Sequence, residues 1–163
     1  MQNYGDVTFR YIAVGNEIKL HGPFAKFLFL AMQNIRTAVY SASLGKKIQV
    51  STPINQAAFA ESYPPSKGSF TSEYQSLLDL IIGYLVKYKH PLLVNMYPYL
   101  SYIGNTQYVH LEYAFFTPPS AEVRDGEIGY QNIFDAILDA FYSALEKANG
   151  SSLKILVSKT GWP

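Results

Sequence analysis

Four short apolar runs, separated by long stretches with helical periodicity, constrain the fold of this chain more than any other feature. The runs cover residues 9–14, 48–54, 92–96 and 155–157. Their apolar residues are nearly continuous, which is typical of strands that are buried on both faces of a parallel sheet. The sequence therefore predicts four parallel strands in one sheet.

Amphipathic helical patterns separate these predicted strands. The three patterns cover residues 24–41, about 72–88 and about 132–148. Ser72 and Gln75 predict a capping box at the start of the second helix, and Gly150 follows the end of the third. Alternating strands and helices with right-handed crossovers predict an α/β fold, in one domain over residues 1–163. The long stretch 98–129 is predicted to be irregular.

The composition excludes several classes of protein. Hydrophobic residues make up 48% and charged residues 15% of the chain, which indicates a globular domain rather than a disordered one. The net charge of +1 without a basic run argues against a nucleic-acid partner. No apolar run reaches the length that spans a membrane, and residues 1–10 lack the apolar core of a signal peptide, so neither a membrane partner nor an export signal is predicted.

The sequence also argues against a metal site or a bound cofactor. Cysteine is absent, which excludes thiolate ligands and disulfides. His21, His90 and His110 are scattered without ligand spacing, and no nucleotide- or metal-binding motif is present. No metal and no cofactor are therefore expected.

Polar side chains follow each of the four predicted strands. In chain order, the strand ends carry Asn16, Glu17, Pro53, Asn55, Asn95, Tyr97, Tyr99 and Lys159, all of them polar except Pro53. Ligands of α/β folds bind at the carboxyl ends of the strands, so this pattern predicts a site. Because turns are polar in any fold, spacing alone leaves a ligand site and ordinary turns as equal alternatives.

Five motifs in order along the chain resemble one known family. They read YIAVGNEI, VSTPINQAAFAESYPPSKGSF, HPLLVNMYPYLSYIGN, YQNIFDAILDAFYSALEKANG and ILVSKTGWP. Together they are similar to the plant family 17 glycoside hydrolases, the endo-β-1,3-glucanases, over essentially the whole chain. The resemblance implies a (β/α)8 TIM barrel, a β-1,3-glucan partner and hydrolysis with retention at the anomeric carbon.

The resemblance also implies a role for individual residues. In the family the glutamate of the VGNE motif is the general acid/base, which corresponds to Glu17 here. Asn16 beside it is expected to bind the sugar 2-hydroxyl. Asn95, Tyr97 and Tyr99 match the NxYPY stretch that lines the family's substrate cleft.

Some of these residues have simpler structural alternatives. The rings of Tyr102 and Trp162, like those of Tyr97 and Tyr99, suit the C–H faces of glucose, but packing under the loops is the favoured role for Trp162. Glu17 taken alone could be a turn carboxylate near a helix start. The motif around Glu17 favours catalysis.

The chain departs from the family at Lys159. The family's last motif reads VSE(S/T)GWP, and its glutamate is the nucleophile. An ammonium group cannot form the glycosyl ester, and its positive charge favours the ionised form of Glu17, which is the wrong state for a general acid. The long lysine stem predicts a direct ion pair with Glu17. Asp125, Glu127 and Glu61 lie in predicted loops and are not expected to replace the nucleophile.

The chain also departs from the family in length. A full barrel takes roughly 250 residues, and the resemblance places 9–14 at strand four and 155–157 at strand seven. About four β/α units are thus expected, with open outer edges that favour self-association. The resemblance implies a secreted protein of the cell wall or vacuole.

The preferred interpretation is an endo-β-1,3-glucanase sequence that is truncated and inactive as written. One alternative is a non-catalytic β-glucan-binding protein that keeps the aromatic residues of the cleft. A second alternative is a non-functional gene fragment.

Overall fold

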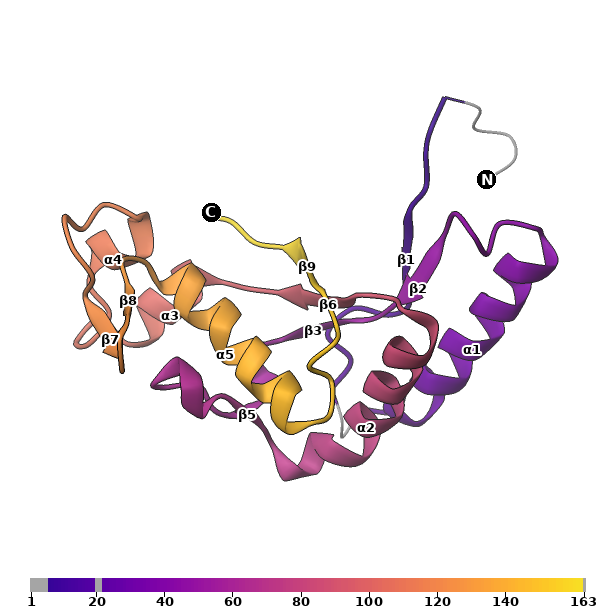
Figure 1. The fold of residues 1–163 in the computed structure, drawn as a ribbon, viewed down its shortest axis with the longest axis horizontal. Helices are drawn as coiled ribbons and strands as arrows, with labels where there is room; N and C mark the ends of the chain where they lie inside the picture. Colours follow the sequence, from indigo (N-terminus) through magenta and orange to yellow (C-terminus); the bar gives the residue numbers. More distant parts are fainter. Residues whose placement is uncertain (1–5, 20–21, 163) are drawn as a thin grey trace.

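The computed structural model describes residues 6–19 and 22–162, so His21, which was not expected to bind a metal, lies outside the described residues. Parallel strands alternate with helices along the chain (Figure 1). The parallel strands are β1 (Tyr11–Ala13), β2 (Gln49–Ser51), β3 (Pro53–Asn55), β6 (Leu92–Asn95) and β9 (Ile155–Lys159). The long helices are α1 (Ala25–Ser41), α2 (Ser72–Tyr88) and α5 (Ile133–Lys147).

The strands lie side by side in chain order. β1 pairs with β2, and β3, β6 and β9 pair in that order, with every pairing parallel. Thr52 alone separates β2 from β3. These two strands therefore connect the two sheets, and all five parallel strands follow one another in chain order. The prediction of four parallel strands is confirmed, and this succession is that of an α/β barrel.

The core lies between the central strands and the three long helices. All four residues of β6 are buried, and α5 contributes Ile137, Phe141 and Leu145 from one side of the helix. β1 and β9 are less buried and each pairs with one neighbour among the described strands. Self-association through these edges stays a prediction.

The capping residue predicted for α2 is wrong by one position. Thr71 has extended backbone angles, and its hydroxyl accepts a hydrogen bond from Tyr74 N, whereas Ser72 is already helical. Asn132 caps α5 in the same manner, with its Oδ1 accepting from Asp135 N at 2.8 Å. Both caps satisfy backbone donors that a helix start leaves free.

The region between β3 and α2 forms a small structured insertion between a barrel strand and its helix. It contains two 3₁₀ turns and an antiparallel pair of strands. In order these are η1 (Gln56–Ala58), β4 (Phe59–Glu61), η2 (Pro65–Lys67) and β5 (Ser69–Phe70).

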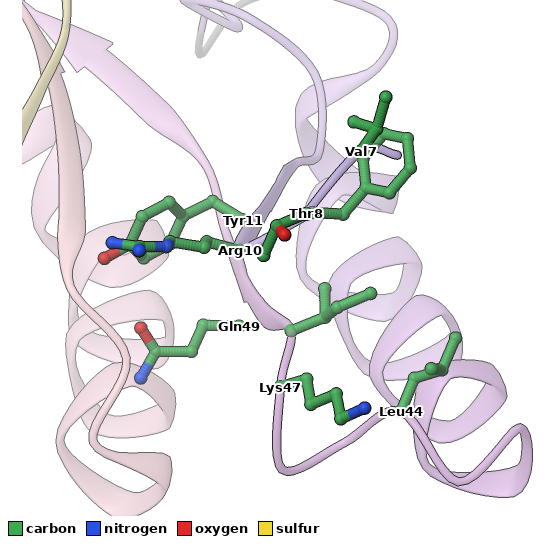
Figure 2. A pocket seen from close by; sticks show the side chains of 9 residues that line it. Val7, Thr8, Arg10, Tyr11, Leu44, Lys47 and Gln49 are labelled. Carbon is green, nitrogen blue, oxygen red and sulfur yellow. The ribbon is translucent and has the colours of Figure 1, made fainter. Parts of the chain in front are cut away.

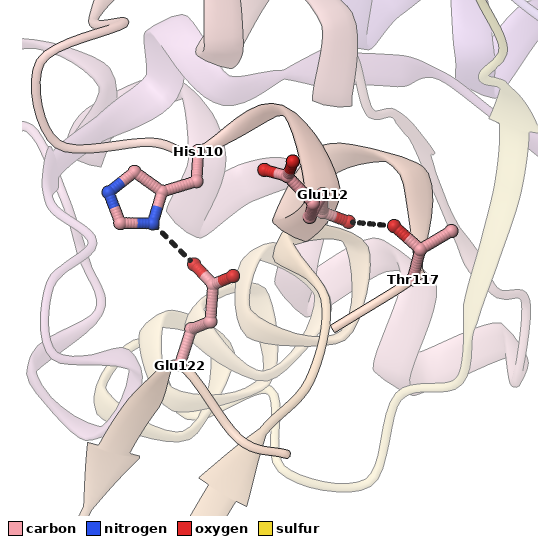
Figure 3. Close-up of polar contacts among 4 residues, drawn as sticks. All are labelled: His110, Glu112, Thr117 and Glu122. Carbon is pink, nitrogen blue, oxygen red and sulfur yellow. Dashed lines mark hydrogen bonds and ion pairs between the residues drawn. The ribbon is translucent and has the colours of Figure 1, made fainter. Parts of the chain in front are cut away.

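The stretch 98–129 is not irregular, contrary to the prediction. It contains α3 (Pro98–Gly104), α4 (Leu111–Phe115) and β7 (Val123–Asp125), which pairs with β8 (Ile128–Tyr130). Figure 3 shows how polar contacts hold this region together. His110 Nδ1 lies 3.2 Å from Glu122 Oε2, and Thr117 Oγ1 donates to Glu112 O at 3.4 Å. The first contact joins the residue before α4 to the residue before β7, and the second joins the first turn of α4 to the residue that follows the helix cap.

His90 is a buried titratable residue between α2 and β6, with 4% of its surface exposed. Its Nδ1 lies 3.1 Å from Val50 N and 2.9 Å from Val50 O. Burial lowers the pKa of His90, the charge of Arg36 acts in the same direction, and the hydrogen bond to Val50 partly opposes them. The rings of Tyr84 and Tyr88 also pack against the imidazole. The folded protein therefore favours neutral His90.

We expect the stability of this fold to fall as the pH drops from about 7 to 5. Because the pKa of His90 is lowered in the folded state, the unfolded chain binds more protons below the ordinary value of about 6.5. Thermal unfolding at both pH values measures this difference. His90→Gln should lose much of the pH dependence. The same pH dependence in the wild-type chain and His90→Gln would contradict this role.

Candidate active site

The turn after β1 places Glu17 beside the carboxyl end of β3. Gly15 and Glu17 both have left-handed backbone angles, with φ of 70° and 50°. A Cβ on Gly15 would lie 2.8 Å from Ile18 Cγ1, so glycine suits this turn sterically as well as conformationally. Glu17 N donates to Pro53 O at 3.1 Å. A left-handed residue other than glycine is uncommon, and such strain is concentrated at functional sites.

Three side chains donate hydrogen bonds to the carboxyl group of Glu17. Asn55 Nδ2 donates to Oε2 at 2.7 Å. Asn95 Nδ2 and the Tyr97 hydroxyl both donate to Oε1, each at 2.5 Å. The donors come from the last residues of β3 and β6 and from the residue before α3, so three successive segments of the chain converge on one carboxyl group.

Asn95 is the buried centre of this network, with 1% of its surface exposed. Its Oδ1 accepts from Ser158 Oγ at 2.8 Å, while its Nδ2 also contacts Asn16 Oδ1 at 3.0 Å. A register shift between β6 and β9 pairs Asn95 with Lys159 and leaves Ser158 as the extra residue of a bulge. Bulges re-aim side chains, and this one accompanies the contact between Ser158 and the Asn95 amide.

The network holds Glu17 in its ionised form. Burial alone would raise the pKa of Glu17, but the hydrogen bonds from Tyr97, Asn95 and Asn55, together with the charge of Lys159, hold the pKa below its ordinary value. Burial and the contacts with Glu17 raise the pKa of Tyr97 to about 12, so its hydroxyl keeps the proton that it donates. At neutral pH the arrangement is therefore a carboxylate that accepts hydrogen bonds.

Lys159 is the last residue of β9 and lies at the same end of the sheet as Glu17. Its side chain is exposed, and its charge contributes to the lowered pKa of Glu17. Among the described residues, however, no direct ion pair joins the two side chains. The predicted ion pair is thus not formed, because the carboxylate oxygens are already bound by neutral donors and the ammonium acts from a greater distance.

Tyr99 belongs to a separate aromatic cluster around Trp162. The ring of Trp162 lies 4.8 Å from Tyr99, 6.2 Å from Tyr102 and 4.2 Å from Phe115, measured between centroids. Trp162 is 37% exposed, so it packs against α3 and α4 while keeping part of its surface free. An apolar groove beside it is lined by Pro98, Ala114, Phe115, Phe116, Phe134, Thr160, Gly161 and Trp162.

The structure thus brings together part of the predicted set. Asn16, Glu17, Asn95 and Tyr97 form one hydrogen-bonded group with Lys159 nearby, whereas Tyr99 packs edge-to-face against Trp162. Their catalytic and binding roles stay predictions. The sequence reasoning marked Asn55 as a polar strand end without giving it a role, and it missed Ser158 altogether.

Two other features do not contribute to this group. A pocket lined by Val7, Arg10, Tyr11, Leu44 and neighbouring residues lies at the amino-terminal ends of β1 and β2, the opposite end of these strands from Glu17 (Figure 2). Within residues 6–19 and 22–162, no cluster of three or more His, Asp or Glu side chains is arranged to hold a metal ion. In the same ranges, no helix is long and apolar enough to span a bilayer.

Comparison with known proteins gives a single family. The family described as glycosyl hydrolases family 17 matches residues 1–163. A glucan endo-1,3-beta-glucosidase of Vitis vinifera is 50% identical, over 99% of this chain and 48% of the relative. The basic vacuolar isoform of Nicotiana plumbaginifolia is 47% identical, over 97% of this chain and 44% of the relative. The chain therefore spans about half the length of the curated relatives that it matches.

Two solved structures share the fold. One, from work on two plant beta-glucan endohydrolases with distinct substrate specificities, superposes with a TM-score of 0.93 and 42% identity, over 100% of this chain and 52% of that chain. The other is CJP38, described as a beta-1,3-glucanase and allergen of Cryptomeria japonica pollen. It superposes with a TM-score of 0.92 and 36% identity, over 98% of this chain and 50% of that chain. The expected fold, part of a (β/α)8 barrel, is confirmed.

Proposed function

The chain belongs to glycosyl hydrolase family 17, and from that premise we propose that it carries part of a β-1,3-glucan-binding cleft but does not cleave the glucan as written. The observation that carries this proposal is the carboxylate of Glu17, which three neutral donors hold ionised near the ammonium group of Lys159.

Retaining hydrolysis needs two carboxyl groups with different tasks. One protonates the leaving oxygen, and the other, about 5 Å away, attacks the anomeric carbon. By the family motif, Lys159 stands where the attacking carboxylate is expected. Because an ammonium group has no lone pair to offer while it is charged, this position cannot form the covalent glycosyl intermediate.

The acid half of the mechanism is also unfavourable in this chain. A general acid must carry its proton at the working pH, and enzymes raise the pKa of a catalytic glutamate for this purpose. Here the pKa of Glu17 is lowered instead. An ionised carboxylate still accepts hydrogen bonds from sugar hydroxyls, so the site keeps a means of binding glucan without the means of cutting it.

We further propose that the protein binds β-1,3-glucan in the cell wall or the vacuole. The support is that a relative of this chain is named a basic vacuolar isoform.

Titration of the chain with a laminari-oligosaccharide, followed by NMR, tests binding. We expect saturable shifts at Glu17 and Tyr97, and weaker binding of a cello-oligosaccharide of equal length. Tyr97→Ala removes both a ring and a donor to Glu17, so it should weaken affinity by about tenfold or more, or about 1.4 kcal/mol. Tyr142→Ala, at an exposed position on α5, is the matched control and should leave affinity unchanged.

Two results would contradict this proposal. Absence of saturable binding by the folded chain would favour the interpretation of a sequence without a selected function. Equal losses of affinity in Tyr97→Ala and Tyr142→Ala would show that the sugar does not bind at Glu17.

A further inference from the structure

Asn55 has an amide whose orientation is set by the backbone that follows it. Its Oδ1 accepts a hydrogen bond from Ala57 N at 3.0 Å and so caps the 3₁₀ turn η1. An amide that accepts with its oxygen presents its NH₂ group in the other direction. That group faces Glu17 and donates to Oε2 at 2.7 Å. The cap and the contact with Glu17 therefore require the same orientation.

Asn95 is oriented in the same manner by a different element. Its Oδ1 accepts from Ser158 Oγ, so its Nδ2 is left to donate to Glu17 Oε1. Both carboxyl oxygens thus meet amide donors whose oxygens are occupied elsewhere. Neither amide can turn its oxygen toward Glu17 without losing a second hydrogen bond.

We propose that Asn55 is a positioning residue, which uses its amide to fix the carboxyl group of Glu17 and to keep Oε2 as a hydrogen-bond acceptor. A protonated Oε2 would point its hydrogen at another donor, so one hydrogen bond would have to break before the carboxyl group could act as an acid. Asn55 thereby both fixes the position of the Glu17 side chain and favours its ionised form.

Two other groups that face Glu17, Tyr97 and Lys159, also favour its ionised form. Tyr97 donates from the start of α3, and Lys159 on β9 adds a positive charge. Tyr97 differs from the two amides because its hydroxyl can rotate to accept a hydrogen bond instead. Asn55 is therefore the donor to Oε2 that keeps this oxygen unprotonated. The inference deepens the proposed function, but its test needs no glucan.

The test is a pH titration of the Glu17 side-chain carbon by NMR in the free 163-residue chain, with the resonance assigned by Glu17→Gln. Asn55→Ser keeps an oxygen that can cap η1 but removes the donor, so it should raise the Glu17 pKa by about half a unit or more. Asn55→Asp should raise it further, because two carboxyl groups would share a proton. Asn34→Asp, the same exchange at an exposed position of α1, should leave it unchanged.

An unchanged Glu17 pKa in a folded Asn55→Ser variant would overturn the proposal, since it would leave Asn55 as a helix cap only. If Asn55→Asp does not fold, Asn55→Ser decides alone. Binding of oligosaccharide is measured separately, so failure of this inference and failure of the proposed function are distinguishable.

Discussion

In a full-length relative, lysine at the position that corresponds to Lys159 is expected to lower glucan hydrolysis by about 10⁴-fold or more, equivalent to about 5 kcal/mol of transition-state stabilisation. The reason is twofold: the attacking carboxylate is removed, and a positive charge is placed where it lowers the pKa of the general acid. The measurement is kcat on a soluble β-1,3-glucan, with thermal unfolding to show that the variant is folded. Retained hydrolysis in that variant would contradict the role given to this position.

The converse exchange in the present chain has a smaller expected effect. Lys159→Glu should raise the pKa of Glu17, because a positive neighbour is replaced by a negative one. It should restore little hydrolysis, since these 163 residues span about half the length of the relatives. Lys154→Glu, at the other end of β9, makes the same change of charge and should leave the Glu17 pKa unaffected.

Gly68→Ala is expected to destabilise the fold by about 3 kcal/mol or more, which would prevent folding of a marginally stable chain. Gly68 follows η2 and is packed against α5, where a Cβ would lie 2.2 Å from Ala140 O and 2.8 Å from Ala140 C. These are backbone atoms, so α5 itself would have to move. Lys147 Nζ, which donates to Gly68 O at 2.8 Å and to Ser66 O at 3.2 Å, would lose the shorter of these hydrogen bonds in that movement.

Chemical denaturation of the wild-type chain and two glycine variants measures this effect. Gly83 lies inside α2, and a Cβ added there would meet no atom within 4 Å outside its own helix turn, so Gly83→Ala is the matched control. It should stabilise the chain by about 0.5 to 1 kcal/mol, since alanine favours the helix interior. A loss below about 1 kcal/mol in Gly68→Ala would contradict the tight packing of η2 on α5.

Most of the barrel-forming elements could be predicted because their burial leaves a regular pattern. The nearly continuous apolar run 92–96 contains β6, whose four residues are all buried. Helix α2 has the predicted bounds. The cap was misplaced because Thr71 and Ser72 are both suitable capping residues, and only the extended backbone of Thr71 decides between them.

The stretch 98–129 could not be predicted because tertiary contacts maintain its short helices. α3 and α4 are too short for a helical period to emerge from the sequence. Trp162 packs edge-to-face against Tyr99, from α3, and stacks on Phe115, from α4. Since Trp162 is distant in the sequence, local propensity carries no sign of these contacts.

The candidate site was only partly predictable for a similar reason. The motif around Glu17 pointed to a functional carboxyl group, but its partner Asn55 lies 38 residues away and Ser158 lies 63 residues from Asn95. A lysine stem is long enough for the ion pair that was expected. Three neutral donors occupy the carboxylate instead, which no spacing in the sequence could reveal.

The most direct test of the central claim is the release of reducing ends from a soluble β-1,3-glucan by the folded 163-residue chain, measured between about pH 4 and 8 over hours at high protein concentration. The matched comparison is Glu17→Gln, which removes the carboxyl group. We predict that both proteins release no more reducing ends than buffer at every pH. Robust release by the wild-type chain that Glu17→Gln abolishes would contradict the account of Lys159 and Glu17.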